Sequence, residues 1–254
     1  MSGGLAILGL LTLSTTAVSQ ATSFADWELV RTLDLHGPTN HVQGIDFDAT
    51  ILWLTSVDTK SHKGFLQTFA LDSGELLRTI EIQDNQRFHP GGIASDAASL
   101  WIPVAEYRPN STSVIQKRNK RTLDLEFQFP VSDHIGCVAM TPEHLIGGNW
   151  DSRDFYVWDH RGNLLRKIAN SNANAYQDMK FETPYVVASG LLPDRSGAID
   201  WLEIPSLQLS RRVIVGNTDR KTPLTREGMA IHDDRLCLLP EDNPSRLFVY
   251  RRKR

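Results

Sequence analysis

The chain has only two cysteines among its 254 residues, and no long apolar run follows its N-terminal segment. Cys137 and Cys237 are too few for a disulfide framework and lack the spacing of a metal or redox motif. Each lies in an apolar, strand-like run, so we expect two small buried side chains, although an exported protein could join them in a disulfide. The absence of a second long apolar run excludes a helical membrane domain in the rest of the chain.

The sequence also lacks a strong excess of charge of either sign. Its 27 basic and 30 acidic residues leave a net charge of −3, with an isoelectric point near 6.2. This balance gives no reason to expect nucleic acid or an anionic membrane as a partner. With 41% hydrophobic and 22% charged residues, the chain is predicted to be a folded globular protein. We expect a monomer that binds a small-molecule ligand.

The N-terminal segment, residues 1–21, is the one long apolar stretch. The letters GLAILGLLTLSTTAVSQA form an apolar core followed by small residues, which is typical of a secretory signal peptide cleaved after Ser19 or Ala21. No Lys or Arg precedes the apolar core, so a membrane anchor or a truncated start is the alternative. We expect a secreted or periplasmic protein whose single domain, residues 22–254, has no stable membrane insertion after cleavage.

An internal repeat dominates the rest of the chain. Related segments begin at residues 41, 89, 134, 175 and 225: HVQGIDFD, HPGGIASD, HIGCVAMT, AYQDMKFE and TREGMAIH. Each is followed by a second and a third β-rich run, and the first four units have a fourth run after a turn such as SGE or RGN. Four strands repeated at intervals of 41 to 50 residues are typical of the blades of a β-propeller.

The fifth repeat lacks its fourth strand, and residues 27–35, WELVRTLDL, resemble the fourth strand of the first repeat, ELLRTIEI. We therefore predict an all-β, five-bladed propeller with four antiparallel strands per blade, whose last blade is completed by the N-terminal strand. Such a closure hides two sheet edges that would otherwise invite aggregation. An open β-sandwich of many strands is the alternative architecture.

A propeller brings the starts of the first strands and the loops between second and third strands to one face. The turns on the other face, such as SDAAS and DSGE, are plain, whereas the predicted site face is rich in charged and aromatic residues. Four of its five loops contain an acid close to an arginine: Glu106 with Arg108, Asp151 with Arg153, Asp194 with Arg195, and Asp242 with Arg246. Such pairs could also be surface ion pairs that tie neighbouring blades together.

Histidines occupy the first position of three consecutive repeats, namely His41, His89 and His134. Imidazoles gathered with a carboxylate make either a metal site or an acid–base site. As metal ligands we predict His41, His89 and His134, with Zn or Fe better suited than Ca, and the absence of a metal remains an alternative. As catalytic residues we predict His89, His134 and Glu227. A channel filled by polar side chains and water is the competing interpretation.

Other residues on the predicted face are candidates for substrate binding. Arginines would hold a carboxylate or phosphate, and aromatic rings would provide flat walls for a sugar. The candidates are Glu106, Tyr107, Arg108, Trp150, Arg153, Gln177 and Asp178. Glycines beside the histidines, such as Gly91 and Gly92, are expected to leave a cavity.

The motifs HPGGIASDAASLWIPVAEYRPNSTSVI, DHIGCV, AYQDMKF, ASGL and LPEDNPSRLFVY together resemble an uncharacterised family of mostly exported bacterial proteins with a domain of unknown function. The resemblance covers residues 41–250 and supports the fold and the motif positions, but implies no reaction. The segments Gln43-Gly44-Ile45 and Glu227-Gly228-Met229 are loosely similar to the blade starts of five-bladed glutaminyl cyclases, from which the preceding histidines depart.

These observations favour a hydrolase or lyase acting on a small polar, anionic or sugar-like molecule at the mouth of the channel. A non-catalytic binding module for a ligand or a protein, on the same face, is the principal alternative. A purely structural scaffold within a larger assembly would expose an apolar patch elsewhere on the surface.

Overall fold

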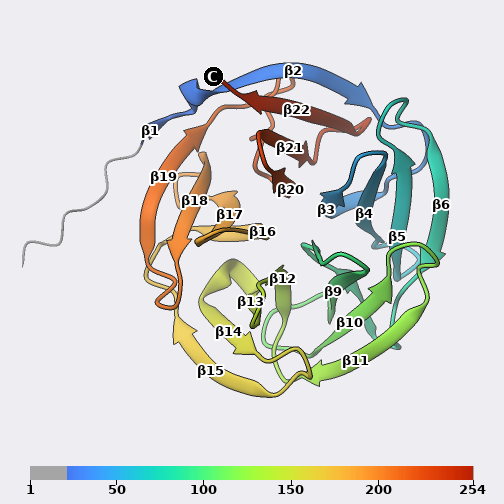
Figure 1. Ribbon diagram of the computed structural model, residues 1–254. Helices are drawn as coiled ribbons and strands as arrows, with labels where there is room; N and C mark the ends of the chain where they lie inside the picture. Colours follow the sequence, from blue (N-terminus) through green and yellow to red (C-terminus); the bar gives the residue numbers. More distant parts are fainter. Residues whose placement is uncertain (1–21, 254) are drawn as a thin grey trace, which may run out of the picture.

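The computed structural model describes residues 22–253, which form a closed ring of five β-sheets (Figure 1). The predicted signal peptide lies outside the described residues. Each sheet is a blade of antiparallel strands, arranged from the centre of the ring outward, as the repeat predicted.

The blades have the following bounds. Blade 1 comprises β3 (His41–Phe47), β4 (Ile51–Asp58), β5 (Lys63–Ala70) and β6 (Leu76–Glu81). Blade 2 comprises β7 (Arg87–Pro90), β8 (Ala94–Ser95), β9 (Ser99–Glu106), β10 (Ser113–Asn119) and β11 (Leu125–Val131). Blade 3 comprises β12 (Ile135–Met140), β13 (Leu145–Asn149), β14 (Asp154–Trp158) and β15 (Leu164–Ala169).

Blade 4 comprises β16 (Ala175–Glu182), β17 (Tyr185–Leu191), β18 (Gly197–Glu203) and β19 (Leu209–Val215). Blade 5 comprises β20 (Glu227–His232), β21 (Arg235–Pro240), β22 (Arg246–Arg252) and the N-terminal β2 (Trp27–Asp34). The short strand β1 (Thr22–Ser23) pairs in parallel with β19. Two single 3₁₀ turns, η1 (Phe24–Asp26) and η2 (Trp150–Ser152), complete the described elements.

The burial of the strands follows their distance from the ring's axis. Second strands such as β4 and β9 are buried along nearly their whole length, because neighbouring blades cover both faces of the sheet. Their sequences are accordingly largely apolar, whereas the outermost strands β6 and β15 are largely exposed and mix apolar with charged residues.

Five apolar clusters form the core, one at each interface between adjacent blades. Trp101 of blade 2 packs with Trp158 of blade 3, and Trp201 of blade 4 packs with Met229 of blade 5. The ring is therefore stabilised by contacts between blades, and no blade has a core of its own.

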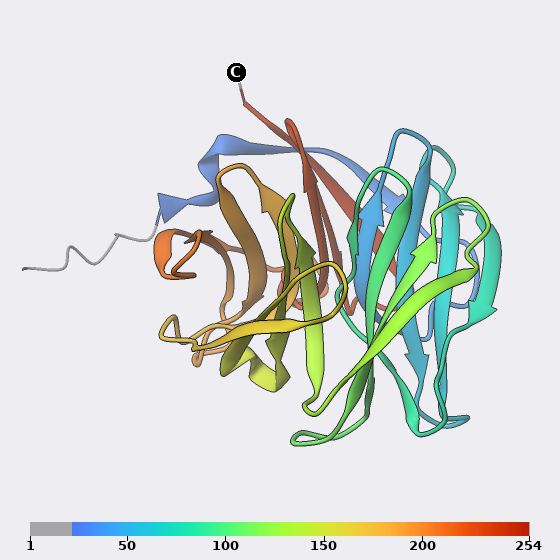
Figure 2. The same ribbon diagram turned by 60° about the horizontal axis from the view of Figure 1, so that its bottom comes forward.

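The N-terminal strand closes the ring. β2 lies antiparallel to β22, with Leu33 opposite Leu247, and both side chains belong to the core between blades 5 and 1. Figures 1 and 2 show β2 as the outermost strand of the blade that contains the C-terminus. This confirms the predicted completion of blade 5.

The glycines near the centre do not leave the cavity that the sequence suggested. A Cβ atom on Gly91 would lie 1.9 Å from the carbonyl oxygen of Gly136, and one on Gly44 would lie 2.4 Å from the Cα atom of Gly92. Gly92 also forms an isolated parallel bridge with Cys137 of the next blade. The glycines thus let the backbones of the innermost strands come into direct contact, which corrects the expectation of open space.

A buried ion pair joins the blades at this level. Asp178 and Lys180 of β16 are almost inaccessible and lie 2.6 Å apart, Oδ1 to Nζ. The other carboxylate oxygen of Asp178 accepts the backbone N–H groups of Ile45 and Met229, from blades 1 and 5. Lys180 donates to the carbonyl of Ile93 in blade 2. One carboxylate and one ammonium therefore connect four of the five blades.

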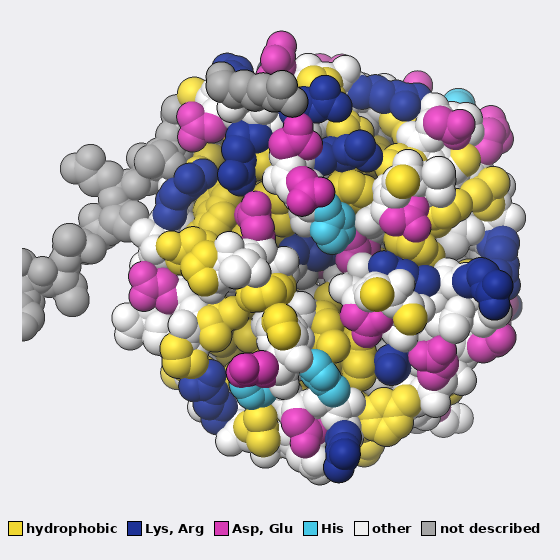
Figure 3. Space-filling view, in the orientation of Figure 1, with side chains coloured by type: hydrophobic (Ala, Val, Ile, Leu, Met, Phe, Trp, Pro, Cys, Tyr) yellow, Lys and Arg dark blue, Asp and Glu magenta, His cyan; other side chains and the backbone are white. Residues whose placement is uncertain are grey.

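Both cysteines are buried and free, as expected. Among residues 22–253, no helix is long and apolar enough to cross a membrane. Figure 3 shows one face of the ring, on which acidic, basic and apolar side chains are interspersed around a central hollow.

Candidate functional site

The site face carries the starts of the first strands together with the loops between second and third strands. Strand pairing places these segments side by side: Arg87, at the start of blade 2, pairs with Glu106 at the end of β9. In blade 5, Glu227 pairs with Pro240, which directly precedes Glu241. The face predicted to carry the chemistry is thus assembled from residues far apart in the sequence.

His89 occupies a central position in this face. Its Nε2 atom lies 3.0 Å from Oε1 of Gln43, whose own amide nitrogen donates to the carbonyl of Val42. Because Gln43 presents an oxygen, Nε2 carries the proton of the neutral ring and Nδ1 carries the lone pair. That Nδ1 atom is buried and has no hydrogen-bond partner among the described residues. Burial, together with the charges of His134 and His41, holds the pKa of His89 well below its ordinary value.

His134 is buried and has the opposite tautomer. Its Nδ1 atom lies 2.9 Å and 3.1 Å from the carbonyl oxygens of Glu106 and Arg108, so Nδ1 must donate. Burial lowers the pKa of His134, although the two carbonyls and the charges of Asp133 and Asp151 act in the other direction. His134 therefore anchors the loop that contains Glu106 and Arg108, and its Nε2 atom is left with the lone pair.

Aromatic rings surround the two histidines. Tyr107 meets His89 edge to face, with ring centroids 4.4 Å apart, and stacks on Phe88. Trp150 meets His134 edge to face at 4.6 Å, and the His89 and His134 rings lie 5.3 Å apart. Burial and the negative charges of Glu227 and Glu241 raise the pKa of Tyr107, so this ring lies within electrostatic reach of both carboxylates.

Glu227 and Glu241 form a pair of carboxylates beside His41. Glu227 is only 7% exposed and has φ = +112°, a backbone conformation that residues other than glycine rarely adopt. Burial and the charge of Glu241 raise the pKa of Glu227 to about 8. Glu241 lies 2.8 Å from Nδ1 of His41, in a contact that lacks hydrogen-bond geometry, and 2.7 Å from Arg226.

One potential metal-binding group is found among the described residues. Ligand atoms of His41, Glu227 and Glu241 all lie within 4.8 Å of one another. One imidazole nitrogen with two carboxylate oxygens is a donor set that suits Zn or Fe. Of the predicted ligands, His41 belongs to this group and His89 and His134 do not; its other members are the two glutamates. We call His41, His89, His134, Glu227 and Glu241 the acid–base cluster.

The other predicted site residues have different surroundings. Glu106 is joined to Arg108 at 2.7 Å and also accepts from Thr112, so Arg108 already has a carboxylate partner. Asp178 is fully buried in the ring's interior, where Oδ1 accepts from Lys180 and Oδ2 accepts from the backbone of Ile45 and Met229.

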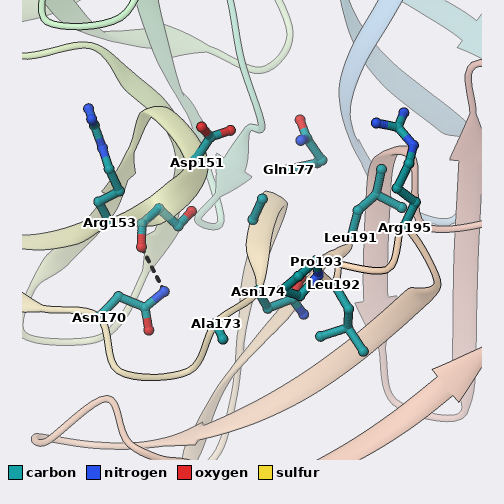
Figure 4. A pocket seen from close by; sticks show the side chains of 12 residues that line it. Asp151, Arg153, Asn170, Ala173, Asn174, Gln177, Leu191, Leu192, Pro193 and Arg195 are labelled. Atoms are coloured by element: carbon teal, nitrogen blue, oxygen red, sulfur yellow. Dashed lines mark hydrogen bonds between the residues drawn. The ribbon is translucent and has the colours of Figure 1, made fainter.

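Gln177 and Arg153 line a separate hollow of about 420 Å³ between blades 3 and 4 (Figure 4). Arg195 lines the same hollow, from the loop between β17 and β18. The structure thus divides the predicted substrate-binding residues between the surroundings of the acid–base cluster, this hollow and the ring's interior.

Only two of the four predicted acid–arginine pairs form within their loops. Glu106 contacts Arg108, and Asp242 contacts Arg246. Asp194 instead accepts from the backbone and hydroxyl of Ser196, and Arg153 approaches Asn110 at 3.3 Å. Adjacency in sequence did not decide these pairings, because the side chains of neighbouring strand-end residues point in different directions.

Two residues of this face, one in the cluster and one in contact with it, were not predicted as site residues from the sequence. Glu241 directly follows the second strand of blade 5, as Glu106 ends the second strand of blade 2, so the repeat alignment could have found it. Gln43 occupies the third position of the first repeat, but its role in fixing the His89 tautomer depends on a contact between blades 1 and 2.

The fold and this cluster define a class: a five-bladed β-propeller whose polar site faces one end of the ring. The sequence profile of the family of unknown function DUF6454 matches residues 10–185, which is most of the chain, and the protein therefore belongs to this family. No curated protein matches the chain by sequence.

Several solved structures share the fold. Glutaminyl cyclase from Myxococcus xanthus superposes with a TM-score of 0.67 at 13% identity, covering 89% of this chain and 95% of the cyclase. The Pan2 WD40 domain of Neurospora crassa gives 0.51 at 12% identity, over 90% and 73% of the two chains. A chain of a nidogen–laminin complex gives 0.53 at 14% identity, over 82% and 74%. At these identities the likeness shows the fold alone.

Proposed function

We propose that this propeller is an acid–base enzyme, a hydrolase or lyase that acts on a small polar substrate at the site face, with His89 as base and Glu227 as acid. The observation that carries the proposal is the buried, unpartnered Nδ1 atom of His89, whose tautomer Gln43 fixes, in the same cluster as the paired carboxylates. His41 links the two groups, since it influences the pKa of His89 and lies beside Glu227.

The protonation states support this assignment of roles. The lowered pKa keeps His89 neutral and able to accept a proton, while the raised pKa of Glu227, about 8, keeps its carboxyl protonated near neutral pH. Two titratable groups whose environments push their pKa values apart are suited to act as base and acid. His89 would take a proton from water or from a substrate carbon, and Glu227 would give its proton to the leaving group.

The strained backbone of Glu227 is independent support. A φ of +112° costs on the order of 1–3 kcal/mol for a non-glycine residue, and such conformations cluster at functional sites. The surrounding strand pairing, with Pro240 opposite, holds the carboxyl in its buried position. The proposal explains why a glutamate, and not a glycine, occupies this conformation.

The test is turnover on a panel of lactones, glycosides, γ-glutamyl compounds and N-terminal glutaminyl peptides; the last are included because a glutaminyl cyclase shares the fold. His89→Gln and Glu227→Gln should each lower kcat/KM by about 100-fold or more. His144→Gln, in the turn between β12 and β13, is the control and should leave kcat/KM unchanged. A ligand that binds tightly at the site face but is recovered unchanged would favour the non-catalytic binding module.

A metal-dependent form of the same enzyme is the second candidate, supported by the grouping of His41, Glu227 and Glu241. A divalent ion held there would polarise a substrate oxygen or lower the pKa of a bound water. Elemental analysis of purified protein and activity before and after chelation distinguish the two forms. Activity that survives complete chelation would support the metal-free form.

We also propose that the enzyme acts outside the cytoplasm, as a monomer. This proposal is based on the apolar composition of residues 1–21 and the balanced charge of the remainder. Cell fractionation, with sequencing of the mature N-terminus, tests the export.

A further inference from the structure

The hollow between blades 3 and 4 lies on the site face beside the acid–base cluster. Its wall includes η2 and the residues that follow it, the start of β16, and the loop after β17. Asp151, which lines it, is close enough for its charge to influence the pKa of His134. A ligand seated in the hollow would therefore be a neighbour of the cluster.

Arg153 and Arg195 line this hollow, and neither has a carboxylate partner among the described residues. Other arginines of this face do have such partners. Arg108, Arg226 and Arg246 are each within ion-pair distance of an acid. Among residues 22–253, neither Arg153 nor Arg195 forms an ion pair, and Arg153 has only the 3.3 Å contact with Asn110.

Among residues 22–253, neither nearby acid forms an ion pair with these arginines. Asp194, adjacent to Arg195, has Oδ1 occupied by the backbone N–H and hydroxyl of Ser196, at 2.9 Å and 2.6 Å. Asp151 is the one acid in the wall, against two guanidinium groups. Figure 4 shows Arg153 and Arg195 on opposite sides of the hollow, with Asp151 and Gln177 between them.

Basic side chains also line a second hollow of about 550 Å³ between blades 4 and 5. Arg195 lines this hollow too, with Lys221, with Asp194, and with Arg226, which is paired with Glu241. The chain as a whole carries a net charge of −3, so this concentration of basic side chains is a local feature.

The backbone of the first hollow is unusually strained. Four of its lining residues have positive φ although none is glycine: Asp151 at 57°, Ser152 at 49°, Ala173 at 52° and Arg195 at 67°. Such residues are uncommon, and their concentration in one wall is a mark of functional sites. The wall also contains Asn174, which is 2% exposed and whose Oδ1 atom has no hydrogen-bond partner among the described residues.

We propose that this hollow binds the anionic part of the substrate, a carboxylate or a phosphate, through Arg153 and Arg195, and that the amide nitrogen of Gln177 donates to it. Oδ1 of Asn174 is an acceptor and would instead accept a hydrogen bond from a hydroxyl or N–H group of the same substrate. Guanidinium groups are well suited to both anions because their N–H donors match the geometry of the oxygens. The assignment of the anion to the substrate depends on the proposed function, whereas anion binding itself does not. The enzyme would therefore prefer anionic substrates over neutral ones of the same size.

The test is a titration of ¹⁵N-labelled protein followed by two-dimensional NMR, with inorganic phosphate and, separately, succinate as probes. Ionic strength is held constant with chloride, because screening alone weakens surface electrostatics. Chemical-shift changes should concentrate in residues 151–153, 170–177 and 191–196. Changes spread over the whole surface would overturn the proposal.

Variants make the test specific. Arg153→Gln and Arg195→Asn should each weaken binding by about tenfold. Asparagine is chosen for the second position because it tolerates positive φ. Arg161→Gln, in the turn between β14 and β15, is the control and should bind as the wild type does. Equal affinity in the Arg153→Gln/Arg195→Asn double variant and the wild type would overturn the proposal, and the spectra themselves report whether each variant is folded.

The same variants separate this inference from the proposed function. Glu227→Gln should bind phosphate normally while losing turnover. Phosphate binding without turnover of any substrate would support the proposed anion site and contradict the proposed enzyme function. If the protein has turnover but kcat/KM for anionic substrates is the same in the double variant and the wild type, the proposed enzyme function is supported and the proposed anion site is contradicted.

Discussion

Glu227 combines burial, a positive φ and a close carboxylate neighbour in one residue. Burial and the neighbouring carboxylate both disfavour ionisation of Glu227, because desolvation and like charge oppose it, and the positive φ adds backbone strain at the same residue. Their coincidence at the start of β20 indicates a position where the protonation state of the carboxyl matters. His89 is its counterpart, a neutral base with one nitrogen fixed and one free.

The stability of the protein should depend on pH through Glu227. The folded-state pKa of about 8 lies above the ordinary 4.5, so the folded protein binds this proton more tightly than the unfolded chain does. The stabilisation is complete below pH 4.5 and is lost as the pH rises through 8. In Glu227→Gln this loss, on the order of 3 kcal/mol, should be absent.

Urea unfolding at pH 5 and pH 8, with a chelator present, measures this difference. Glu203→Gln, at the exposed end of β18, is the control and should follow the wild type. The free energy of unfolding should decrease more in the wild type than in Glu227→Gln between pH 5 and pH 8. An equal decrease in the two proteins would contradict the raised pKa.

At the scale of elements, the innermost strands depend on glycine for their spacing. The predicted Cβ contact of 1.9 Å between Gly91 and the Gly136 carbonyl involves backbone, which cannot move without displacing a blade. We expect Gly91→Ala to lower the free energy of unfolding by about 3 kcal/mol. Gly216→Ala is the matched control, because no atom lies within 4 Å of its Cβ position, and its effect should be within about 1 kcal/mol. Equal unfolding midpoints for the two variants would argue against direct contact between the blades.

The closing strand β2 offers a second comparison within one element. Leu33 is 5% exposed in the core between blades 5 and 1, whereas Val30 on the same strand is 48% exposed. Leu33→Ala should lower stability by about 3 kcal/mol and Val30→Ala by no more than about 0.5 kcal/mol. Denaturant titrations of both variants measure these losses of unfolding free energy. If the loss for Leu33→Ala is as small as that for Val30→Ala, closure by β2 contributes little to the stability of the ring.

The repeat could predict these elements because each blade repeats the same local pattern. His41 begins β3, Ala175 begins β16, and the strand starting at Trp27 completes blade 5, all as the sequence indicates. The role of Gly91 could not be predicted in the same way, since a glycine beside open space and a glycine against another backbone look identical in a sequence. The hydrogen bond from His89 to Gln43 likewise depends on how two blades are spaced.

At the scale of the whole molecule, the ring should unfold as one unit. The apolar clusters lie between blades, and the pair formed by Asp178 and Lys180 joins blades 1, 2, 4 and 5. Loss of one blade would therefore expose the cores of its two neighbours. Tryptophan fluorescence and far-ultraviolet circular dichroism should give coincident denaturation curves. Two separated transitions would show that some blades unfold independently.

The buried pair at the centre also determines how molecules reach the site. Asp178 and Lys180 fill the centre of the ring at the level where the glycine backbones touch, next to Gly92. In the proposed enzyme, we therefore expect the substrate to enter and the product to leave through the site face. Product that stayed bound would then block entry, as an inhibitor competitive with the substrate does.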